Sequence, residues 1–260
     1  MDRREAVLRE LNLYPLWVRK NMPALEESRT VRPELAEVPG TSMPVESGQA
    51  PTSSARTEMN NDSAGSPVVK PASSVGDIDW LQLKEMVRGC TACKLRAGCT
   101  QTVFGVGDEN ADWLFVGEGP GEEEDAQGEP FVGQAGKLLD NMLLAIKLKR
   151  GENVYIANVV KCRPPNNRNP DAEEIATCLP YLQRQIELIK PKLIMALGKT
   201  ASTALLGKDA PLASLRGTLH DFNGIPLVVT FHPAYLLRSP SEKAKAWQDL
   251  CFATDEMQKL

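Results

Sequence analysis

The chain has 260 residues and a formal net charge of −4 at pH 7. At about 100–200 residues per domain, this length allows one good-sized domain with an appendage, or two small domains. No apolar run reaches the ~18 residues of a membrane helix, and the N-terminus has no apolar secretory segment, so we expect no membrane partner and a cytoplasmic location. The mildly acidic total does not by itself favour a nucleic-acid partner.

Charge and cysteine are unevenly distributed along the chain. Residues 1–80 hold 9 Lys/Arg and 12 Asp/Glu, a balance of −3, whereas residues 81–260 hold 21 and 22, a balance of −1. All six cysteines lie at or after Cys90. Disulfides are disfavoured in the cytosol, so clustered cysteines indicate metal ligands or redox groups.

The first part of the chain predicts an appendage. Apolar residues alternate with Arg and Glu up to Leu13, a pattern typical of an amphipathic helix, which Pro15 ends or kinks. Such a helix is a docking peptide or packs on the domain's own surface. Residues 38–76 are rich in Pro, Gly, Ser, Thr and Ala, which bury too little apolar surface to fold. We expect a docking peptide at 1–20, a disordered linker at 21–76 and a folded domain at 77–260.

Short apolar strands alternate with helices after residue 77. This alternation favours a three-layer α/β/α fold around a parallel-rich sheet of four strands, with its site at the carboxyl ends of the strands. In chain order we expect a helix capped by Asp79 through residue 87, a strand at 113–116, a helix at 136–148, a strand at 154–160, a helix at 171–189, a strand at 192–197, a helix at 199–206, a strand at 226–231 and a helix at 241–256.

Four of the six cysteines form two pairs, one before the first strand and one after the second. Four thiolates in two pairs fit a tetrahedral zinc site or a [4Fe–4S] cluster, and spacing alone does not decide between them. Unrelated buried thiols are the plain alternative. The pairs are Cys90 with Cys93 and Cys162 with Cys178; Cys99 is a competing ligand, and Cys251 is expected in the core.

A glycine-rich turn, residues 117–121 (GEGPG), follows the first strand. Its backbone N–H groups are open to a ligand. A phosphate cradle fits badly because the acidic run 122–125 follows, and the later Gly198-Lys199-Thr200 lacks the first glycine of a phosphate loop, since Leu193 stands there. An acidic loop with open amides suits a neutral planar ligand, or chemistry that forms a cation.

Three side chains at strand ends are candidates for ligand contact. Phe131, between Pro and Gly, is placed to stack on a base or is an ordinary core residue. Asn158 lies inside an apolar strand, where its amide pairs with a nucleobase edge or with a loop backbone. His232 directly follows the fourth strand and is poorly explained as core filler, whereas His220 is expected to be solvated or structural. Apolar residues then precede Arg238, as in wedges that fill a gap in a base stack.

Together these motifs resemble the family 4 uracil-DNA glycosylases, the iron–sulfur branch of that superfamily. The resemblance covers about residues 80–255: the GEGPG turn with Glu124 and Asp125, residues 130–133 (PFVG), Asn158 four residues before Cys162, the four paired cysteines, and residues 232–238 (HPAYLLR). It implies a uracil-DNA glycosylase-like fold, a [4Fe–4S] cluster on Cys90, Cys93, Cys162 and Cys178, and a nucleoid-associated repair enzyme of the bacterial cytosol. Such an enzyme, a monomer, excises uracil from single- or double-stranded DNA without a lyase step.

The resemblance also implies residue roles. The uracil is flipped into a pocket, where Phe131 stacks on it, Asn158 pairs with its polar edge, and Gly117, Glu118 and Gly119 line the wall. His232 stabilises the anion developing at uracil O2, while Glu118 and the acidic loop favour the cationic sugar and position water. The family lacks the activating Asp of the best-known uracil glycosylases, so the water-activating group is not assigned. DNA contacts are expected from Lys161, Arg163, Arg168, Tyr235, Leu236 and Arg238.

The N-terminal residues resemble a different protein. Arg3-Arg4, Leu8, Leu11-Asn12-Leu13, Trp17 and Arg19 are similar to the N-terminal peptide of the psi subunit of the DNA polymerase III clamp loader. The similarity implies a glycosylase tethered to clamp-loader subunits through residues 1–20, or a psi-like subunit that keeps a glycosylase fold. A zinc-bound nucleic-acid module is the third alternative.

Overall fold

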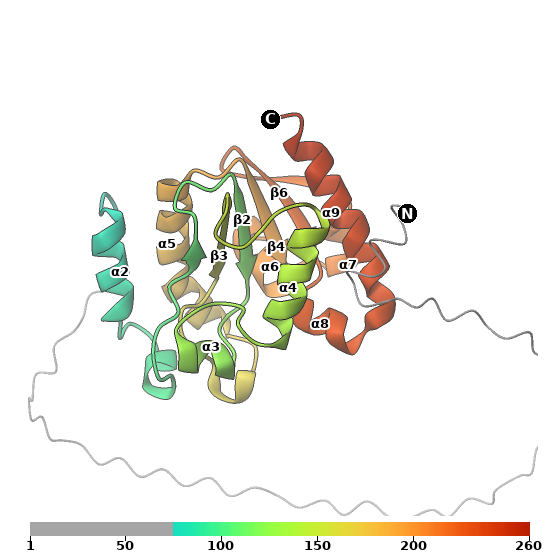
Figure 1. Cartoon of the computed structure of the whole chain (residues 1–260). Coiled ribbons are helices and arrows are strands. Elements are labelled where there is room, and N and C mark those ends of the chain that lie inside the picture. Colours follow the sequence, from blue (N-terminus) through green and yellow to red (C-terminus); the bar gives the residue numbers. More distant parts are fainter. Residues whose placement is uncertain (1–74) are drawn as a thin grey trace, which may run out of the picture. The chain divides into compact units, whose positions relative to one another are not determined.

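A mixed sheet of six strands lies at the centre of residues 75–260, the part of the chain that this computed structural model describes (Figure 1). Its four central strands are parallel, in the order β3 (Val154–Asn158), β2 (Trp113–Gly117), β4 (Leu193–Leu197) and β6 (Ile225–Thr230). The predicted parallel-rich α/β sheet is confirmed. The docking peptide at 1–20 and all but the last two residues of the linker at 21–76 lie outside the described residues.

The predicted number of four strands is wrong, because each edge carries a further short antiparallel strand. β1 (Val106–Gly107) pairs with β3, and β5 (Leu219–Phe222) pairs with β6. β5 and β6 are joined by Asn223-Gly224, both with positive φ, 53° and 86°. Two consecutive left-handed residues are typical of a tight β-hairpin turn, and Asn-Gly is its commonest sequence.

Helices cover both faces of the sheet, as the predicted three-layer fold requires. Along β2, Leu114 and Val116 pack in one core cluster and Trp113 and Phe115 in the other, as the two-residue period of a strand dictates. The first cluster includes residues of α2 (Trp80–Arg88), α5 (Ala172–Ile189), α6 (Lys199–Leu206) and α7 (Leu212–Leu215). The second includes residues of α4 (Gln134–Ala145), α8 (Pro233–Arg238) and α9 (Lys243–Met257).

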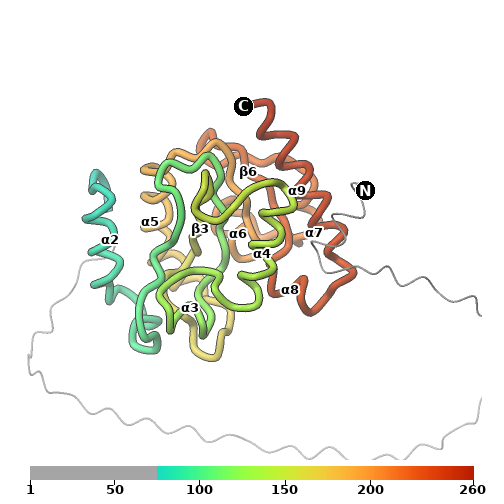
Figure 2. Tube along the Cα trace, viewed as in Figure 1, coloured from blue at the N-terminus to red at the C-terminus, as the bar shows by residue number. Residues whose placement is uncertain are grey.

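Helix starts follow their local sequence signals. Asp79 caps α2 and Asp171 caps α5, each within a capping box in which the third helical residue bonds back to the cap. The short helices α3 (Glu122–Gln127) and α8 lie in strand-end loops where no helix was expected. Figures 1 and 2 show both at the same end of the sheet.

Among the described residues, no helix has the length and apolar character needed to cross a membrane.

Candidate active site

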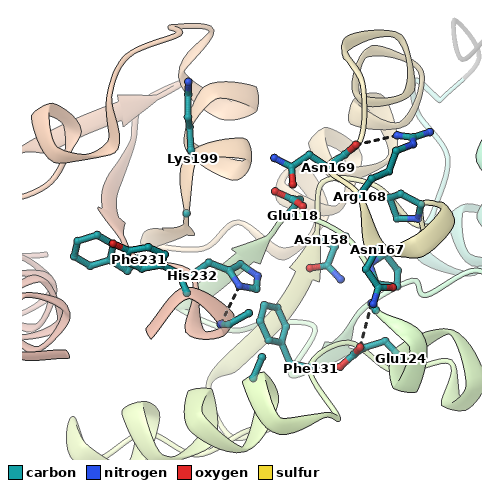
Figure 3. A pocket seen from close by; sticks show the side chains of 18 of the residues that line it. Glu118, Glu124, Phe131, Asn158, Asn167, Arg168, Asn169, Lys199, Phe231 and His232 are labelled. Atoms are coloured by element: carbon teal, nitrogen blue, oxygen red, sulfur yellow. Dashed lines mark hydrogen bonds between the residues drawn. The ribbon is translucent and has the colours of Figure 1, made fainter. Parts of the chain in front are cut away.

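A cavity of about 680 Å³ opens where the parallel strands end. Glu118 reaches it from the end of β2, Asn158 from the end of β3 and His232 from the end of β6. Phe131, from the loop before α4, completes this group, and Figure 3 shows the four side chains around one space. The structure therefore brings together the side chains predicted to have catalytic and base-binding roles. Gly119, Arg168, Tyr235 and Arg238 also line the cavity.

Asn158 contributes an unpaired acceptor to this cavity. The residue is 2% exposed, and its Oδ1 has no hydrogen-bond partner within residues 75–260. Gly117 lies beside it in the sheet, where a Cβ would stand 2.4 Å from that oxygen and 2.6 Å from Cζ of Phe131. Glycine thus lets the two side chains approach each other. A buried carbonyl without a donor costs about 1–3 kcal/mol, so this oxygen is one that a ligand N–H group would satisfy.

Phe131 forms a wall of the cavity in a strained backbone conformation. It is 6% exposed, and its ring centroid lies 5.5 Å from that of the His232 imidazole. Its φ of 56° is left-handed, which costs an L-residue about 1–2 kcal/mol. Arg150 donates to the Phe131 carbonyl at 2.7 Å and to that of Pro130 at 2.9 Å. A Cβ at Gly136 would lie 1.8 Å from the Phe131 carbonyl oxygen, so only glycine fits there.

Two of the four carboxylates in the acidic run 122–125 hold backbone. Glu124 accepts hydrogen bonds from three backbone N–H groups, two of them in the residues directly after Phe131. Asp125 is 4% exposed and accepts from the backbone N–H groups of residues 100 and 101. These two carboxylates are therefore engaged by the protein itself, whereas Glu118 lines the cavity.

His232 presents a neutral imidazole to the cavity. It caps α8: its Nδ1 accepts a hydrogen bond from the backbone N–H of Ala234 at 3.2 Å. Burial, assisted by the positive charge of Arg238, lowers the pKa of His232 to about 4. Near neutral pH the ring therefore carries one proton, and because Nδ1 is an acceptor that proton sits on Nε2. Figure 3 shows the ring beside Phe131 at the cavity wall.

The four paired cysteines surround a second, smaller cavity between the end of β3 and α5. Cys162 and Cys178 are buried, and Sγ of Cys178 accepts the backbone N–H of Lys161 at 3.2 Å. Burial raises the pKa of the Cys178 thiol to about 11, so a bound cation is needed to displace its proton. Within the described residues no three His, Cys, Asp or Glu side chains meet closely enough to hold a single metal ion. Cys99 does not line this cavity, and Cys251 is half-buried on α9.

Known proteins resemble this chain over the same residues. The Uracil DNA glycosylase superfamily matches residues 104–251. The type-4 uracil-DNA glycosylase of Thermotoga maritima is 48% identical over 165 residues, 63% of this chain and 85% of that protein. Those of Pyrobaculum aerophilum and Archaeoglobus fulgidus are 40% and 43% identical, over 66% and 59% of this chain and 92% and 81% of theirs. The chain belongs to the type-4 uracil-DNA glycosylases.

Two expected DNA contacts of this type-4 glycosylase are wrong, because the side chains are buried. Lys161 is 2% exposed, and its Nζ donates to the Asn158 carbonyl at 2.8 Å and to Gln185 Oε1 at 2.6 Å. Leu236 is 1% exposed and packs in the second core cluster, because α8 turns it inward, whereas Leu237 is 43% exposed.

Two arginines of this glycosylase have protein partners that were not predicted. Arg168 lines the cavity, but its guanidinium forms two hydrogen bonds, 2.8 and 2.6 Å, with the buried Glu174. Arg163 donates to Asn167 at 2.7 Å. Tyr235 and Arg238 remain exposed at the cavity, where a nucleic-acid strand can reach them.

Two positioning side chains of the glycosylase site, Arg150 and Thr200, were missed, and Glu124 has another role than the one expected. Arg150 and Glu124 hold the Phe131 loop, and Thr200 donates to the Glu118 carboxylate. No local pattern marks Arg150, because it reaches the loop from 19 residues away. Thr200 had a visible signal: its glycine turn follows a predicted strand and therefore lies at the same end of the sheet as the other site residues.

Proposed function

We propose that the protein is a monofunctional uracil-DNA glycosylase: it flips uracil out of single- or double-stranded DNA and hydrolyses the N-glycosidic bond, leaving free uracil and an abasic site. The observation that carries the proposal is the buried, unpaired Oδ1 of Asn158 in a cavity walled by Phe131. The family of the chain and the printed names of its relatives support it.

The proposed base site fits the chemistry of uracil. Uracil carries an N3–H donor between two carbonyls, and Asn158 Oδ1 is an acceptor that needs such a donor. Cytosine has an unprotonated N3 at this position, so two acceptors would face each other. The Phe131 ring supplies an apolar surface for the base. Gly117 lets the acceptor and the ring lie close enough to contact one small heterocycle together.

In the proposed chemistry, two residues stabilise the charges that develop on the uracil and on the sugar. Cleavage leaves negative charge on the uracil and positive charge on the sugar. His232, neutral with its proton on Nε2, donates a hydrogen bond to uracil O2 as the anion forms. Glu118 brings a carboxylate to the same cavity, where it favours the cationic sugar and orients the attacking water. Each donor or charge aimed in this way is worth about 3–4 kcal/mol of barrier.

The proposed DNA surface surrounds the cavity mouth. Arg238 and Tyr235 lie exposed there and are assigned to the phosphate backbone and to a neighbouring base. The exposed Leu237 replaces Leu236 as the wedge residue that fills the gap left by the flipped nucleotide. Arg168, which lines the cavity, and Arg163 stay assigned to phosphates, through N–H groups that their hydrogen-bonding partners leave open.

The proposed cofactor is a [4Fe–4S] cluster on Cys90, Cys93, Cys162 and Cys178. The donor set is all sulfur, which fits a cluster or a zinc ion, and the type-4 family of the chain favours the cluster. When bound, the cluster supplies a cross-link between the segment before β1, the end of β3 and α5. Lys161 N–H and the Tyr181 hydroxyl, which donates to Cys90 Sγ at 3.3 Å, orient two of the ligands.

The proposed enzyme acts as a monomer in the cytoplasm. A cytoplasmic location fits paired cysteines that bind a metal cluster instead of forming disulfides. The relatives named above are glycosylases, so the psi-like alternative is not proposed. Docking to clamp-loader subunits through residues 1–20, which lie outside the described residues, stays a prediction.

Release of uracil from an oligonucleotide with a single uracil tests the proposal. The full chain, with iron and sulfide content measured, is compared with Asn158→Ala and with Asn110→Ala, a control at an exposed asparagine between β1 and β2. We expect uracil release by the wild type and the control, and a loss of at least 100-fold in Asn158→Ala. No release by the cluster-loaded wild type at enzyme excess would contradict the proposal.

A further inference from the structure

The Glu118 carboxylate is held by a side chain from another strand end. Thr200, in the first turn of α6, donates a hydrogen bond from Oγ1 to Glu118 Oε2. Within residues 75–260 no other hydrogen bond reaches this carboxylate. One oxygen of Glu118 is therefore bound to the protein, and Oε1 is left for a ligand or a water molecule.

The chain places Thr200 there through an unusual turn. Gly198 directly follows β4 with a φ of 88°, a left-handed conformation that favours glycine, and donates its N–H to the Thr230 carbonyl at 2.8 Å. A Cβ on Gly198 would lie 2.9 Å from Cβ of His232. The same glycine thus turns the chain into α6 and lets the end of β6 pack against it. Gly198, two residues before Thr200, therefore lies close to His232.

We infer that Thr200 is a positioning residue for base excision, acting through Glu118. The terminal torsion of a glutamate is broad, so an unrestrained carboxylate samples many orientations. A hydrogen bond to Oε2 fixes the carboxylate plane and keeps Oε1 toward the reacting sugar or its water. Orientation of a reacting group before the transition state is a substantial part of catalysis. This inference rests on the proposed function and deepens it by naming what positions its carboxylate.

A purely structural role gives different expectations. Glu118 lies near the first turn of α6, where a carboxylate stabilises the positive end of the helix dipole. If the contact served only α6, its removal would lower the melting temperature and leave the excision rate of folded enzyme unchanged. A positioning role lowers the rate of the chemical step at saturating enzyme and leaves DNA affinity unchanged.

The test uses Thr200→Val, which keeps the β-branched shape and removes the hydroxyl, and Thr200→Ser, which keeps the hydroxyl. Thr203→Val is the matched control, because Thr203 lies one turn later on the same helix and its buried Oγ1 has no hydrogen-bond partner within the described residues. We expect a loss of about 10- to 100-fold in single-turnover rate for Thr200→Val. Thr200→Ser should stay within about threefold of wild type and Thr203→Val unchanged, with DNA affinity equal throughout.

A double-mutant cycle identifies the residue through which Thr200 acts. In a Glu118→Ala background, Thr200→Val should cause no further loss of rate, since the carboxylate that it positions is gone. An equal loss in both backgrounds, or a wild-type rate in Thr200→Val, would overturn the inference while leaving the proposed function standing. If Thr200→Val does not fold, Thr200→Ala against Thr200→Ser makes the same comparison. Absence of uracil release by the wild type would instead remove the proposed function.

Discussion

Arg150 holds Phe131 in its left-handed backbone conformation by donating to its carbonyl oxygen at 2.7 Å. The same guanidinium donates from Nε to Asp140 of α4 at 2.9 Å, and this bond holds the arginine side chain in place. Strained residues persist where the surroundings hold them, and they cluster at ligand sites. The Arg150 contact therefore links the fold to the ring that walls the base site.

Replacement of Arg150 by alanine is expected to weaken both stability and base binding. Three hydrogen bonds are lost and Phe131 is free to relax, so the free energy of unfolding should fall by about 1–3 kcal/mol. The inhibition constant for free uracil should rise several-fold, because the stacking ring is no longer held in place. Denaturant titration and product inhibition of uracil release measure the two effects.

Arg184 offers the matched control for Arg150. It also makes two hydrogen bonds to a backbone carbonyl, that of Ile78 at 2.9 and 2.7 Å, and it lies on α5 away from the cavity. Arg184→Ala should lower stability by a similar amount and leave uracil inhibition unchanged. If the inhibition constant for uracil is the same in Arg150→Ala as in Arg184→Ala, Arg150 acts on stability alone.

His232 is expected to stay neutral across the working pH range. Burial lowers its pKa from 6.5 to about 4, so the ratio of wild-type to His232→Ala excision rates should be constant from about pH 5.5 to 9. The chain has two histidines, so NMR titration of wild type and His220→Gln identifies the His232 signal. A midpoint near 6.5, or a rate ratio that rises on acidification, would mean that the cation is the active form.

The same pKa shift predicts how stability depends on pH. The unfolded chain takes up the His232 proton near pH 6.5, whereas the folded protein takes it up only near pH 4. The stability associated with this shift is therefore present above pH 6.5 and is lost as the pH falls toward 4, by roughly 3 kcal/mol in total. In His232→Gln this acid-dependent loss should be absent, as urea titrations at pH 7 and 4.5 would measure.

Much of the site follows from the sequence because the carboxyl ends of parallel strands meet. Asn158, Glu118 and His232 each follow an apolar run, so their convergence needs only the α/β fold. Side-chain direction in the loops does not follow, since it depends on local helices. Leu236 turns inward because residues 233–238 form α8, and Lys161 turns inward because Gln185 Oε1 and the Asn158 carbonyl accept its hydrogen bonds.

The edge strands escape prediction for a related reason. β1 has two residues and β5 has four, so their residues show no apolar alternation long enough to count. They pair only because β3 and β6 already present open edges. The glycine contacts behind the site are likewise tertiary: Gly117 is needed because Asn158 and Phe131 approach from two other segments.

The salt dependence of DNA binding should distinguish the exposed Arg238 from the buried Lys161. Arg238→Ala is expected to reduce the slope of log affinity against log salt by about 1, because one phosphate contact is lost. Lys161→Met should leave the slope unchanged, since its Nζ is buried against Asn158 and Gln185. It should instead lower the free energy of unfolding by about 1–3 kcal/mol, because two acceptors lose their donor. A reduced slope in Lys161→Met would show that this lysine reaches DNA.

Removal of single cysteines is expected to divide the six thiols into two classes. Cys178→Ser should lose the visible colour of an iron–sulfur protein and fall well below the about four irons per chain of the wild type. Cys251→Ser is the matched control, because this cysteine lies on α9, away from the cavity of the paired thiols. Cys99→Ser should also keep its iron, since Cys99 does not line that cavity although it lies close to Cys162. Iron loss in Cys99→Ser with retention in Cys178→Ser would show that Cys99, and not Cys178, is a cluster ligand. A colourless wild type that holds one zinc ion per chain would show that the site binds zinc and not a cluster.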